Sequence, residues 1–405
     1  MQKLNPTPHQ KLVLPAPSAD AQQASLQLQE LIRAEIAQSG GIMPFSRYME
    51  MALYAPRLGY YSGGSTKLGA DGDFTTAPEM SSLFGATLAQ VAHQLFAQTA
   101  PEIMEFGAGS GKLAFDILSE CQHSSIPLRR YFIVELSGEL RARQEERLKD
   151  FPQVVWLDHM PEAFSGLVLG NEVLDAMPVE LVMKAEDTWS RLGVSQHAGT
   201  EAIFSLVNMQ DDQRHDENAP TWLRQIPEAD TLPEGYISET HPVAQGFIRS
   251  VASMLLAGQA QSGTAGVSIW FDYGFPAHEY YLPLRDKGTL MCHYRHHAHP
   301  DPFYLPGLQD ITAHVDFSAM ARAGVEAGLD LLAYTSQAGF LLETSLTDIL
   351  SRLPVDASAQ YLPATNAVQK LISPAEMGEL FKVLILGCGI DLPDNLLRHD
   401  RSHRL

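Results

Sequence analysis

The sequence contains few cysteines and no long hydrophobic run, and both absences exclude classes of protein. Its three cysteines, Cys121, Cys292 and Cys388, stand far apart and form no CxxC pair. A disulfide framework and a cysteine-based zinc site are therefore not expected. No apolar stretch reaches the about 18 residues that a membrane-spanning helix needs, so we expect no membrane insertion. Four prolines within the first 17 residues interrupt any targeting presequence, and we expect a cytoplasmic protein.

Basic residues are also scarce, with 28 Lys and Arg against 48 Asp and Glu, and the formal net charge is −20. A chain with this charge repels phosphate backbones, so we expect no nucleic-acid partner. The same charge suits a cationic partner, such as a basic protein segment. Hydrophobic residues make up 45% of the 405 residues, which is typical of a folded protein. The length fits either two structural regions or one large α/β domain with insertions.

The N-terminal quarter is predicted to contain a tail followed by helices. We expect residues 1–25 to form a flexible tail and residues 26–100 to form a helical region that covers a cofactor. Apolar residues recur at helical spacing over 28–36 and again over 46–53, which predicts two amphipathic helices.

A glycine-rich segment at 59–80 follows these helices. Its composition fits either an ordinary surface loop or a loop that covers a ligand. The segment ends in Thr76 and Glu79, which match the T-x-x-E capping box of a helix start.

Strand-like and helical segments alternate over 101–183, which predicts a Rossmann-like α/β core. We assign this range to cofactor binding. Residues 184–240 contain short strand candidates around a polar run at 211–218 and are interpreted as an insertion or substrate region. Residues 241–405 are expected to complete the sheet and to add C-terminal elements.

The sharpest local motif is EFGAGSGKL, which begins at Glu105 between a short apolar strand and a helix. Gly107, Gly109 and Gly111 allow backbone amides to approach a ligand at the start of that helix. A dinucleotide fingerprint would need glycine at position 112, where the chain has Lys112. The ExGxGxG pattern instead matches the first motif of class I methyltransferases, which use S-adenosylmethionine. The alternative is an ordinary tight turn.

Acidic residues end the next two predicted strands. Glu135 stands where a carboxylate can accept hydrogen bonds from both ribose hydroxyls of an adenosine ligand. Asp158 ends the third strand, where a side chain can contact the adenine amino group. A helix cap and a turn residue are the respective alternatives. Because of their position relative to the glycine loop, we assign both residues to the cofactor site.

Polar residues also follow the strongly apolar fourth strand, in the segment LVLGNEVLDAMPVE. Asn171, Glu172 and Asp175 stand there at the carboxyl edge of the predicted sheet, where open α/β sheets bind ligands. A buried polar cluster is costly unless it is solvated or paired, so we interpret it as facing the substrate. The alternative is an ordinary cap of the following helix by Asn171.

Two further patterns resemble metal sites and are interpreted otherwise. Histidines stand at 293, 296, 297 and 299, but no carboxylate or cysteine arrangement completes a recognisable site, so no metal is predicted. The DxG sequence at Asp272 is interpreted as a turn at the end of a strand.

The chain resembles the MidA family in five segments that occur in order: GDFTTAPEMSSLFG, EFGAGSGKLAFDIL, GNEVLDAMPVE, SETHPVA and QDITAHVDF. This family comprises bacterial and mitochondrial proteins related to the arginine methyltransferase of respiratory complex I assembly. The resemblance extends from about residue 45 to 340. It implies a bacterial enzyme with a class I methyltransferase fold, an N-terminal helical extension and S-adenosylmethionine as cofactor. It also implies arginine methylation of a protein partner such as a complex I subunit.

A guanidinium acceptor needs carboxylates that hold its planar group with one nitrogen facing the methyl donor. We assign Glu172 to this role as a catalytic residue, with Asp175 and Glu239 as its partners. Asn171 is assigned to orienting the cofactor or the substrate by hydrogen bonding.

The loop at 72–79, with Thr76 and Pro78, is expected to close over the cofactor. Two other functions stay open at this point: a methyltransferase that acts on a small molecule, and a cofactor-binding assembly factor with little turnover. The sequence makes no prediction of oligomeric state or of the degree of methylation.

Overall fold

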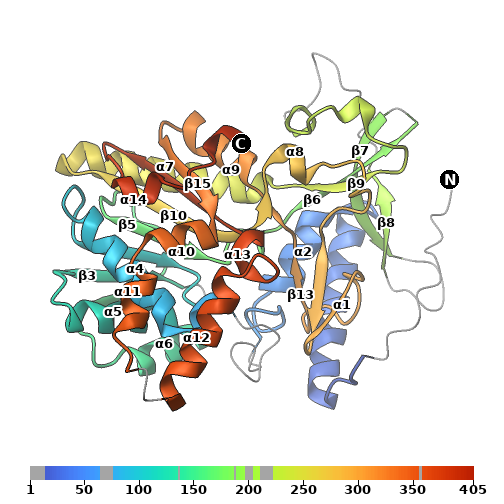
Figure 1. Cartoon of the computed structure of the whole chain (residues 1–405). Helices are drawn as coiled ribbons and strands as arrows, with labels where there is room; N and C mark the ends of the chain where they lie inside the picture. Colours follow the sequence, from blue (N-terminus) through green and yellow to red (C-terminus); the bar gives the residue numbers. More distant parts are fainter. Residues whose placement is uncertain are drawn as a thin grey trace.

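The computed structural model describes residues 14–63, 76–135, 137–186, 188–196, 204–209, 222–354 and 358–405. Within these residues the chain forms a large sheet covered by helices and, beside it, a smaller sheet packed against the N-terminal helices (Figure 1). The predicted loop residues 72–75 and the polar run at 211–218 lie outside the described residues.

The large sheet contains the strands that the alternating pattern over 101–183 predicts, together with strands from the range 241–405 that was expected to complete it. They are β2 (Glu102–Phe106), β3 (Arg130–Val134), β4 (Val154–Leu157), β5 (Leu167–Asn171), β10 (Gly266–Phe275), β15 (Asp330–Ser336) and β16 (Phe381–Cys388), with the short β14 (Val315–Asp316) beside β10. The spatial order is β15-β16-β10-β5-β2-β3-β4. Strands β10, β5, β2, β3 and β4 are parallel, whereas β16 is antiparallel to both neighbours. This is the predicted Rossmann-like α/β fold.

Within the large sheet the chain reverses its direction after β4, and again where β16 returns between β15 and β10. After β4 at one edge, it returns to the middle and places β5 on the far side of β2. Phe106 pairs in register with Gly170, so the loops that follow β2 and β5 start side by side. A crevice at such a switch point is the usual ligand site of an open α/β sheet.

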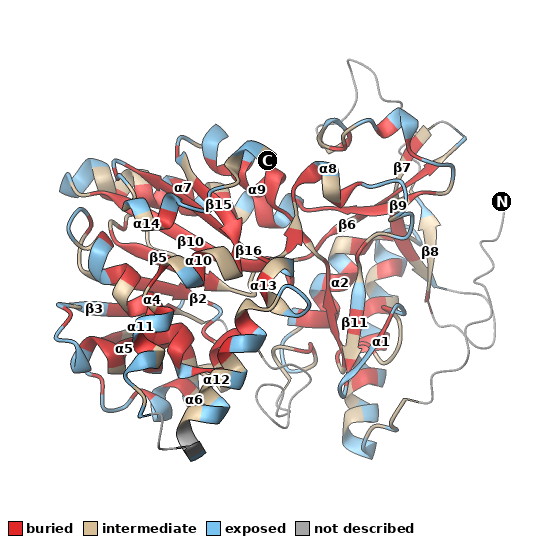
Figure 2. Ribbon diagram, viewed as in Figure 1, coloured by how far each residue is buried: buried red, intermediate tan, exposed pale blue. Residues whose placement is uncertain are grey.

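Helices cover both faces of the large sheet, so its strands are buried on both sides (Figure 2). Successive side chains of a strand point to opposite faces, and accordingly Ile103 lies in one core and Met104 in the other. One core is shared with α4 (Ser82–Leu95), α5 (Lys112–His123), α10 (Gln337–Glu343), α11 (Leu346–Ser351) and α12 (Ser358–Ile372), and the other with α7 (Pro242–Ser262) and α9 (Phe317–Glu326). Further helical segments are α6 (Gly138–Arg147), α8 (Ala277–Tyr280), α13 (Met377–Leu380), α14 (Asp394–Leu397), η1 (Leu223–Gln225), η2 (Ala229–Thr231) and η3 (Ser402–Arg404).

The smaller sheet combines segments that are far apart in the sequence. Its strands are β1 (Met43–Pro44), β6 (Glu180–Ala185), β7 (Thr188–Gln196), β8 (Phe204–Asn208) and β9 (Ile237–Thr240), in the order β1-β7-β6-β9 with β8 beside β7. A core joins it to the helices α1 (Ala19–Gln38) and α2 (Phe45–Tyr54) and to the three-stranded sheet of β11 (Met291–Tyr294), β12 (His297–His299) and β13 (Asp310–Thr312). The predicted boundaries at 184–240 and 241–405 therefore divide a unit that packs together.

The N-terminal prediction needs a correction. Helix α1 begins at Ala19, after Ser18 accepts a hydrogen bond from the N–H of Ala21, and Ser25 is buried. The tail predicted over residues 1–25 is therefore wrong for 19–25, and residues 1–13 lie outside the described residues. The helix predicted over 46–53 is confirmed as α2.

The predicted capping box is also wrong. The helix it should start is split into α3 (Ala77–Met80) and α4, and the Thr76 side chain forms no capping hydrogen bond. Ser81 starts α4 instead by accepting from the N–H of Leu83 at 3.2 Å. Glu79 is drawn away because its carboxylate accepts a hydrogen bond from the Ser110 hydroxyl of the glycine loop.

Candidate functional site

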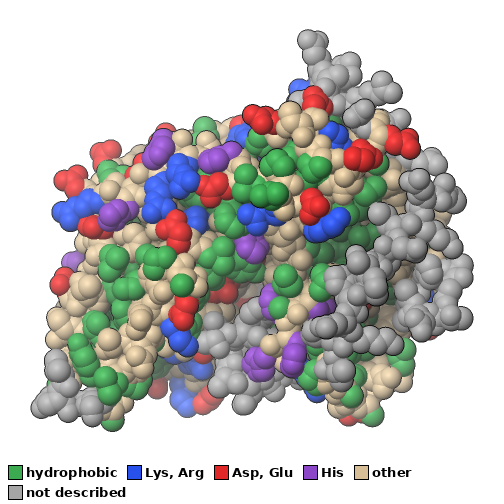
Figure 3. Space-filling model, turned by 45° about the vertical axis from the view of Figure 1, so that its right-hand side comes forward, with side chains coloured by type: hydrophobic (Ala, Val, Ile, Leu, Met, Phe, Trp, Pro, Cys, Tyr) green, Lys and Arg blue, Asp and Glu red, His purple; other side chains and the backbone are tan. Residues whose placement is uncertain are grey.

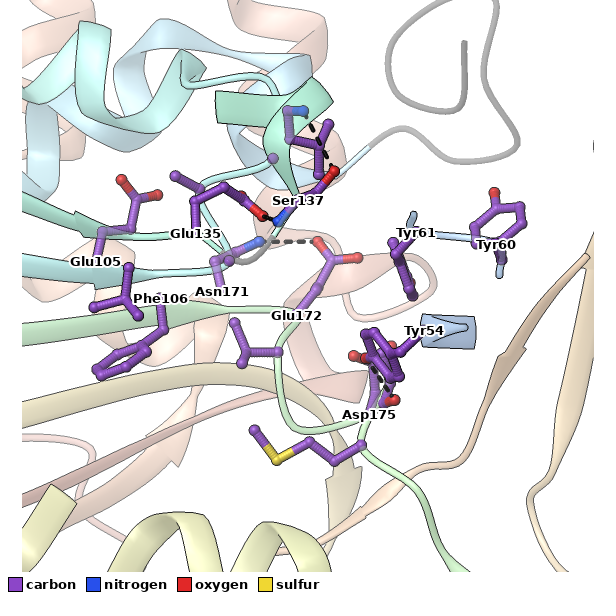
Figure 4. A pocket seen from close by; sticks show the side chains of 18 of the residues that line it. Tyr54, Tyr60, Tyr61, Glu105, Phe106, Glu135, Ser137, Asn171, Glu172 and Asp175 are labelled. Atoms are coloured by element: carbon purple, nitrogen blue, oxygen red, sulfur yellow. Dashed lines mark hydrogen bonds between the residues drawn. The ribbon is translucent and has the colours of Figure 1, made fainter. Parts of the chain in front are cut away.

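A cavity of about 910 Å³ lies where β2, β3 and β5 end. This volume is at the upper end of the range of about 300–1,000 Å³ for small-molecule sites. Figure 4 shows its side chains converging from the large sheet and from the N-terminal helices. One end is bordered by the glycine loop and Glu135, and the other by Glu172, Asp175 and a group of tyrosines. We call these the cofactor end and the acceptor end.

At the cofactor end, the glycine loop has the backbone that its sequence predicts. Gly107, Gly109 and Gly111 have φ values of 66°, 52° and 78°, in the left-handed region that glycine tolerates. A Cβ at Gly107 would stand 2.9 Å from Val173, and one at Gly111 would stand 3.2 Å from the Gln144 side chain. Gly111 is the N-cap of α5, so the loop presents backbone at a helix N-terminus.

Glu135 is held at the end of β3 by donors from its own surroundings. The N–H of Ser137 and the Nε2 of Gln144 donate to its two carboxylate oxygens at 2.8 and 2.9 Å. Gln144, fully buried on α6, also donates to the carbonyl of Gly109 at 2.9 Å and accepts from the Trp156 indole at 3.1 Å. This glutamine, which the sequence analysis missed, therefore joins the glycine loop, the end of β3 and β4.

Glu105 and Asp158, two other predicted cofactor residues, also border the cavity, but their side chains are bonded to other protein residues. Glu105 is buried, and its carboxylate accepts from the Tyr131 hydroxyl at 2.7 Å. Burial raises the pKa of Glu105 to about 7. Asp158 has an 83% exposed side chain and forms an ion pair with Arg141 at 2.6 Å. Contact of either side chain with a cofactor stays a prediction.

The predicted covering loop enters the described residues at Thr76. Thr76, Pro78 and Glu79 all line the cavity beside the glycine loop. The hydrogen bond between Glu79 and Ser110 ties the start of α3 to that loop, and Arg147 donates to Ser110 at 2.7 Å. The position of these residues suits a ligand cover.

At the acceptor end, Glu172 directly follows β5 with φ of 53°, in the left-handed region. This conformation turns the chain sharply, while the Glu172 N–H donates to the carbonyl of Phe271 at 2.8 Å. Asn171 Nδ2 donates to the Glu172 carboxylate at 3.1 Å. Burial and, after it, the neighbouring Asp175 raise the pKa of Glu172 to about 8. Asn171, Glu172 and Asp175, which were predicted to face the substrate, therefore all line the cavity.

Asp175 is buried three residues further on. Its Oδ2 accepts from the Tyr273 hydroxyl at 2.5 Å, whereas its Oδ1 is buried and has no hydrogen-bond partner among the described residues. Burial raises the pKa of Asp175. Asp272 shapes this loop, because its Oδ2 accepts from the N–H groups of Leu174 and Asp175 at 2.9 and 3.3 Å. The prediction of a turn at the DxG sequence is wrong, because Asp272 to Gly274 lie within β10, and Asp272 instead holds the loop after β5.

The prediction for Glu239 is wrong. Glu239 is fully buried on β9 and does not line the cavity. Its carboxylate accepts from the N–H groups of Thr289 and Leu290, both at 2.9 Å, and from the Tyr280 hydroxyl at 2.8 Å. These bonds anchor the start of β11, so Glu239 is a structural residue.

The structure adds residues that the sequence analysis did not assign to the site. Tyr54, Tyr60, Tyr61 and Asp310 line the acceptor end. They come from the end of α2, the turn after it and the start of β13. A signal was present, because the glycine-rich segment begins GYYSGG and the QDITAHVDF segment contains Asp310. Neither segment follows a core strand, so edge-of-sheet reasoning did not find them.

The basic side chains of the described lining have acidic partners of their own. Lys112 pairs with Asp116 at 2.5 Å, and Arg47 pairs with Glu35 and Glu50 at 2.5 and 2.8 Å. Within the described residues, no Lys or Arg forms an ion pair with Glu172 or Asp175. The acceptor end is therefore acidic, and a cationic ligand would be favoured there.

The described residues contain no group of three or more His, Cys, Asp or Glu side chains placed to hold a metal ion. His293, His297 and His299 of the histidine tract lie on the hairpin of β11 and β12. None of the helices in the described part of the chain has the length and hydropathy of a membrane span.

The cofactor end fits S-adenosylmethionine on structural grounds. The left-handed glycines provide a cradle that side chains would fill, the start of α5 provides backbone donors, and Glu135 provides an oriented carboxylate for hydroxyl groups.

Comparison with known proteins agrees with this geometry. Residues 83–335 match the family described as "Putative S-adenosyl-L-methionine-dependent methyltransferase". A curated relative from Drosophila melanogaster, "Protein arginine methyltransferase NDUFAF7 homolog, mitochondrial", is 25% identical and covers 93% of this chain and 88% of its own length. The Mus musculus "Protein arginine methyltransferase NDUFAF7, mitochondrial" is 26% identical over 90% of this chain and 83% of its own.

Two solved structures from Burkholderia thailandensis are similar over nearly the whole chain. One is described as bound to S-adenosyl-homocysteine; it is 50% identical, has a TM-score of 0.88, and covers 97% of this chain and 100% of that chain. The other is a native structure with 50% identity, a TM-score of 0.85 and the same coverage. The ligand of the first is the demethylated form of the predicted cofactor.

Proposed function

This chain belongs to the family of S-adenosyl-L-methionine-dependent methyltransferases that it matches, and from that premise we propose that it methylates arginine side chains of a protein partner. The class I fold and the cofactor, S-adenosylmethionine, are properties of the family and of its solved member. The acceptor and the partner are the proposal. The curated relatives carry the name of arginine methyltransferases, which supports arginine as the acceptor. A respiratory complex I subunit is the first candidate partner because of the resemblance to the MidA family.

One observation carries the proposal: the acceptor end presents Glu172 and Asp175 with no basic partner among the described residues. A guanidinium group is permanently charged and has N–H donors in a planar fork that matches carboxylates. A cation beside these side chains favours their ionised form and opposes the effect of burial on their pKa values. An uncharged small acceptor could donate hydrogen bonds to these side chains but would lack the charge that favours their ionised form.

The cofactor, when bound, supplies an electrophilic methyl group, so alignment of the acceptor is the main task of the protein. Glu172 and Asp175 can hold the guanidinium N–H groups and orient one nitrogen. Methylation of that nitrogen also releases a proton. Without a ligand, burial raises the pKa of Glu172 to about 8. A bound guanidinium favours its ionised form, and the resulting carboxylate can accept that proton.

The surface adds a constraint on the partner. On the face shown in Figure 3, lysine and arginine side chains lie in small groups beside aspartate and glutamate side chains. Together with the formal charge of −20, this distribution favours a basic protein segment over a nucleic acid.

The test is transfer of tritiated methyl groups to proteins of a lysate that lacks this chain, followed by hydrolysis and separation of the labelled amino acids. We expect label in methylarginine that depends on added protein, and purified complex I subunits should then be tested singly. Label in a small-molecule fraction would favour the alternative acceptor. Tight binding of the cofactor without any label would favour an assembly factor.

A further inference from the structure

The acceptor end has a second wall, which comes from the N-terminal helices and the three-stranded sheet. The rings of Tyr54 and Tyr61 stack with centroids 5.5 Å apart and planes at 21°. The Tyr61 hydroxyl donates to both carboxylate oxygens of Asp310, at 3.0 and 2.9 Å. Tyr54 donates to the carbonyl of Ala176 at 2.9 Å, which fixes the stack against the loop after β5. These three side chains therefore form one connected wall.

This wall belongs to the same space as Glu172 and Asp175. The N–H of Ala313, just after β13, donates to the carbonyl of Asp175 at 3.1 Å. Burial is the main cause of the raised pKa values of Glu172 and Tyr54, and repulsion by Asp310 and Asp175 adds to both. In Figure 4 the Glu172 carboxylate projects toward Tyr61.

One carboxylate oxygen of Asp175 could accept a hydrogen bond from a ligand. Asp175 is 5% exposed and lines the cavity, and its Oδ1 has no hydrogen-bond partner among the described residues. A buried carboxylate oxygen without a partner is costly, so a donor supplied by a ligand would be stabilised there. Asp310 lines the same cavity, and besides the Tyr61 hydroxyl it accepts from the N–H of Ile311 at 3.0 Å, so it adds a second, oriented carboxylate to this space.

Carboxylates on two walls beside an aromatic stack suit one kind of cation better than another. A guanidinium is planar, stacks on aromatic rings and donates from several edges at once. An ammonium is compact and strongly hydrated, and it lacks the planar surface with which a guanidinium stacks on a ring.

We propose that Tyr61 and Asp310 are specificity-determining residues, which make the acceptor end select a guanidinium over an ammonium group. The inference rests on the proposed function for the identity of the acceptor, but it concerns binding and not transfer. Asp310 accepts N–H groups from the side of the smaller sheet, Asp175 accepts from the side of the large sheet, and Tyr61 provides the platform.

The experiment measures binding of ethylguanidine and n-butylamine to the full chain saturated with S-adenosyl-homocysteine, by calorimetry or ligand-observed NMR. The wild type should bind ethylguanidine about tenfold more tightly than n-butylamine, the effect of one charge-assisted hydrogen bond. Asp310→Asn and Tyr61→Leu should remove most of this preference. Tyr61→Phe keeps the ring and should retain it.

Asp391→Asn and Tyr361→Phe, both outside the cavity lining, are matched controls and should behave as wild type. Unchanged S-adenosyl-homocysteine affinity shows that each variant is folded. Equal affinity of the wild type for ethylguanidine and n-butylamine, or an unchanged preference in Asp310→Asn, would overturn the inference. A preference for ethylguanidine without methylarginine in the labelling test would leave this inference standing and overturn the proposed function alone. Methylarginine formation with an unaffected Asp310→Asn would do the reverse.

Discussion

The two ends of the cavity are built differently. The cofactor end comes from one stretch of chain, the glycine loop after β2 and Glu135 after β3, with α6 packed across both. The acceptor end comes from α2 and the turn after it, the loop after β5, the end of β10 and the start of β13. The first is a local supersecondary unit, and the second exists only when the smaller sheet packs against the larger one.

The electrostatics of the two ends differ in the same way. Glu135 receives hydrogen bonds from Ser137 and Gln144, so protein donors satisfy its carboxylate. Glu172 is half-buried and Asp175 is buried beside it, and desolvation raises the pKa values of both. The cofactor end is thus arranged in advance, whereas we expect a bound cation to stabilise the acceptor end. Substitutions should therefore separate cofactor binding from transfer.

The largest effect is expected from Gly109→Val, which changes only the cofactor end. The left-handed φ of 52° is unfavourable for a branched residue, and the side chain would occupy space at the glycine cradle. We expect S-adenosyl-homocysteine affinity to fall by more than about 100-fold in a folded protein, combining strain with steric exclusion. Calorimetric titration measures this, with Gly138→Ala as control because a Cβ at Gly138 meets open space. Retained affinity would remove the glycine loop from the site.

The next effect is expected from Glu172→Gln, which changes only the acceptor end. The amide replaces an acceptor oxygen with a donor, so the guanidinium is poorly oriented and its proton has no acceptor. Single-turnover methylation should fall by about 100-fold, while S-adenosyl-homocysteine affinity stays nearly unchanged. Lost cofactor affinity with retained turnover would move Glu172 to the cofactor end.

A smaller effect is expected from Glu135→Ala at the cofactor end. Loss of a carboxylate that accepts from ribose hydroxyls should weaken cofactor binding by about 1–3 kcal/mol. A deoxyribose analogue should be affected less, and Gln144→Met, which acts through Glu135, should fall between Glu135→Ala and wild type. Equal loss with both ligands would show that Glu135 does not bind the ribose.

The smallest effect is a pH dependence of stability that belongs to the acceptor end. Burial raises the pKa of Glu172 from 4.5 to about 8. The folded state therefore binds the proton more tightly than the unfolded chain, and this contribution is present below pH 4.5 and lost as the pH rises through 8. Glu172→Gln cannot ionise, so its Tm relative to wild type should be roughly 1–3 °C higher at pH 8.5 than at pH 5. Scanning calorimetry at both values tests this, with Glu326→Gln at the surface as control. The same Tm difference at both pH values would contradict a buried, protonated Glu172.

Much of the fold could be predicted because its signals are local. The apolar runs that become β2, β3, β4, β5, β10 and β16 are contiguous, and the glycine loop lies between a strand and a helix as its motif requires. The resemblance to the MidA family is confirmed by the family match over residues 83–335 and the solved structures at 50% identity. The errors arose where a local pattern had a distant competitor. Glu79 fits a capping box, yet its carboxylate accepts a hydrogen bond from the Ser110 hydroxyl instead of capping the helix.

The sequence by itself determined the cofactor end, because a cradle made by one loop and the next strand depends on residues that are neighbours along the chain. It also placed Glu172 and Asp175 at the cavity, because they follow the carboxyl end of a core strand, and their roles there stay predictions. Only the tertiary structure decided the rest of the acceptor end. Glu239 is engaged with Tyr280 and Thr289 away from the cavity, whereas Tyr61 and Asp310, 249 positions apart, form a hydrogen bond inside it. Such pairings depend on how the two sheets pack, which cannot be predicted from the spacing of residues within one segment of the sequence.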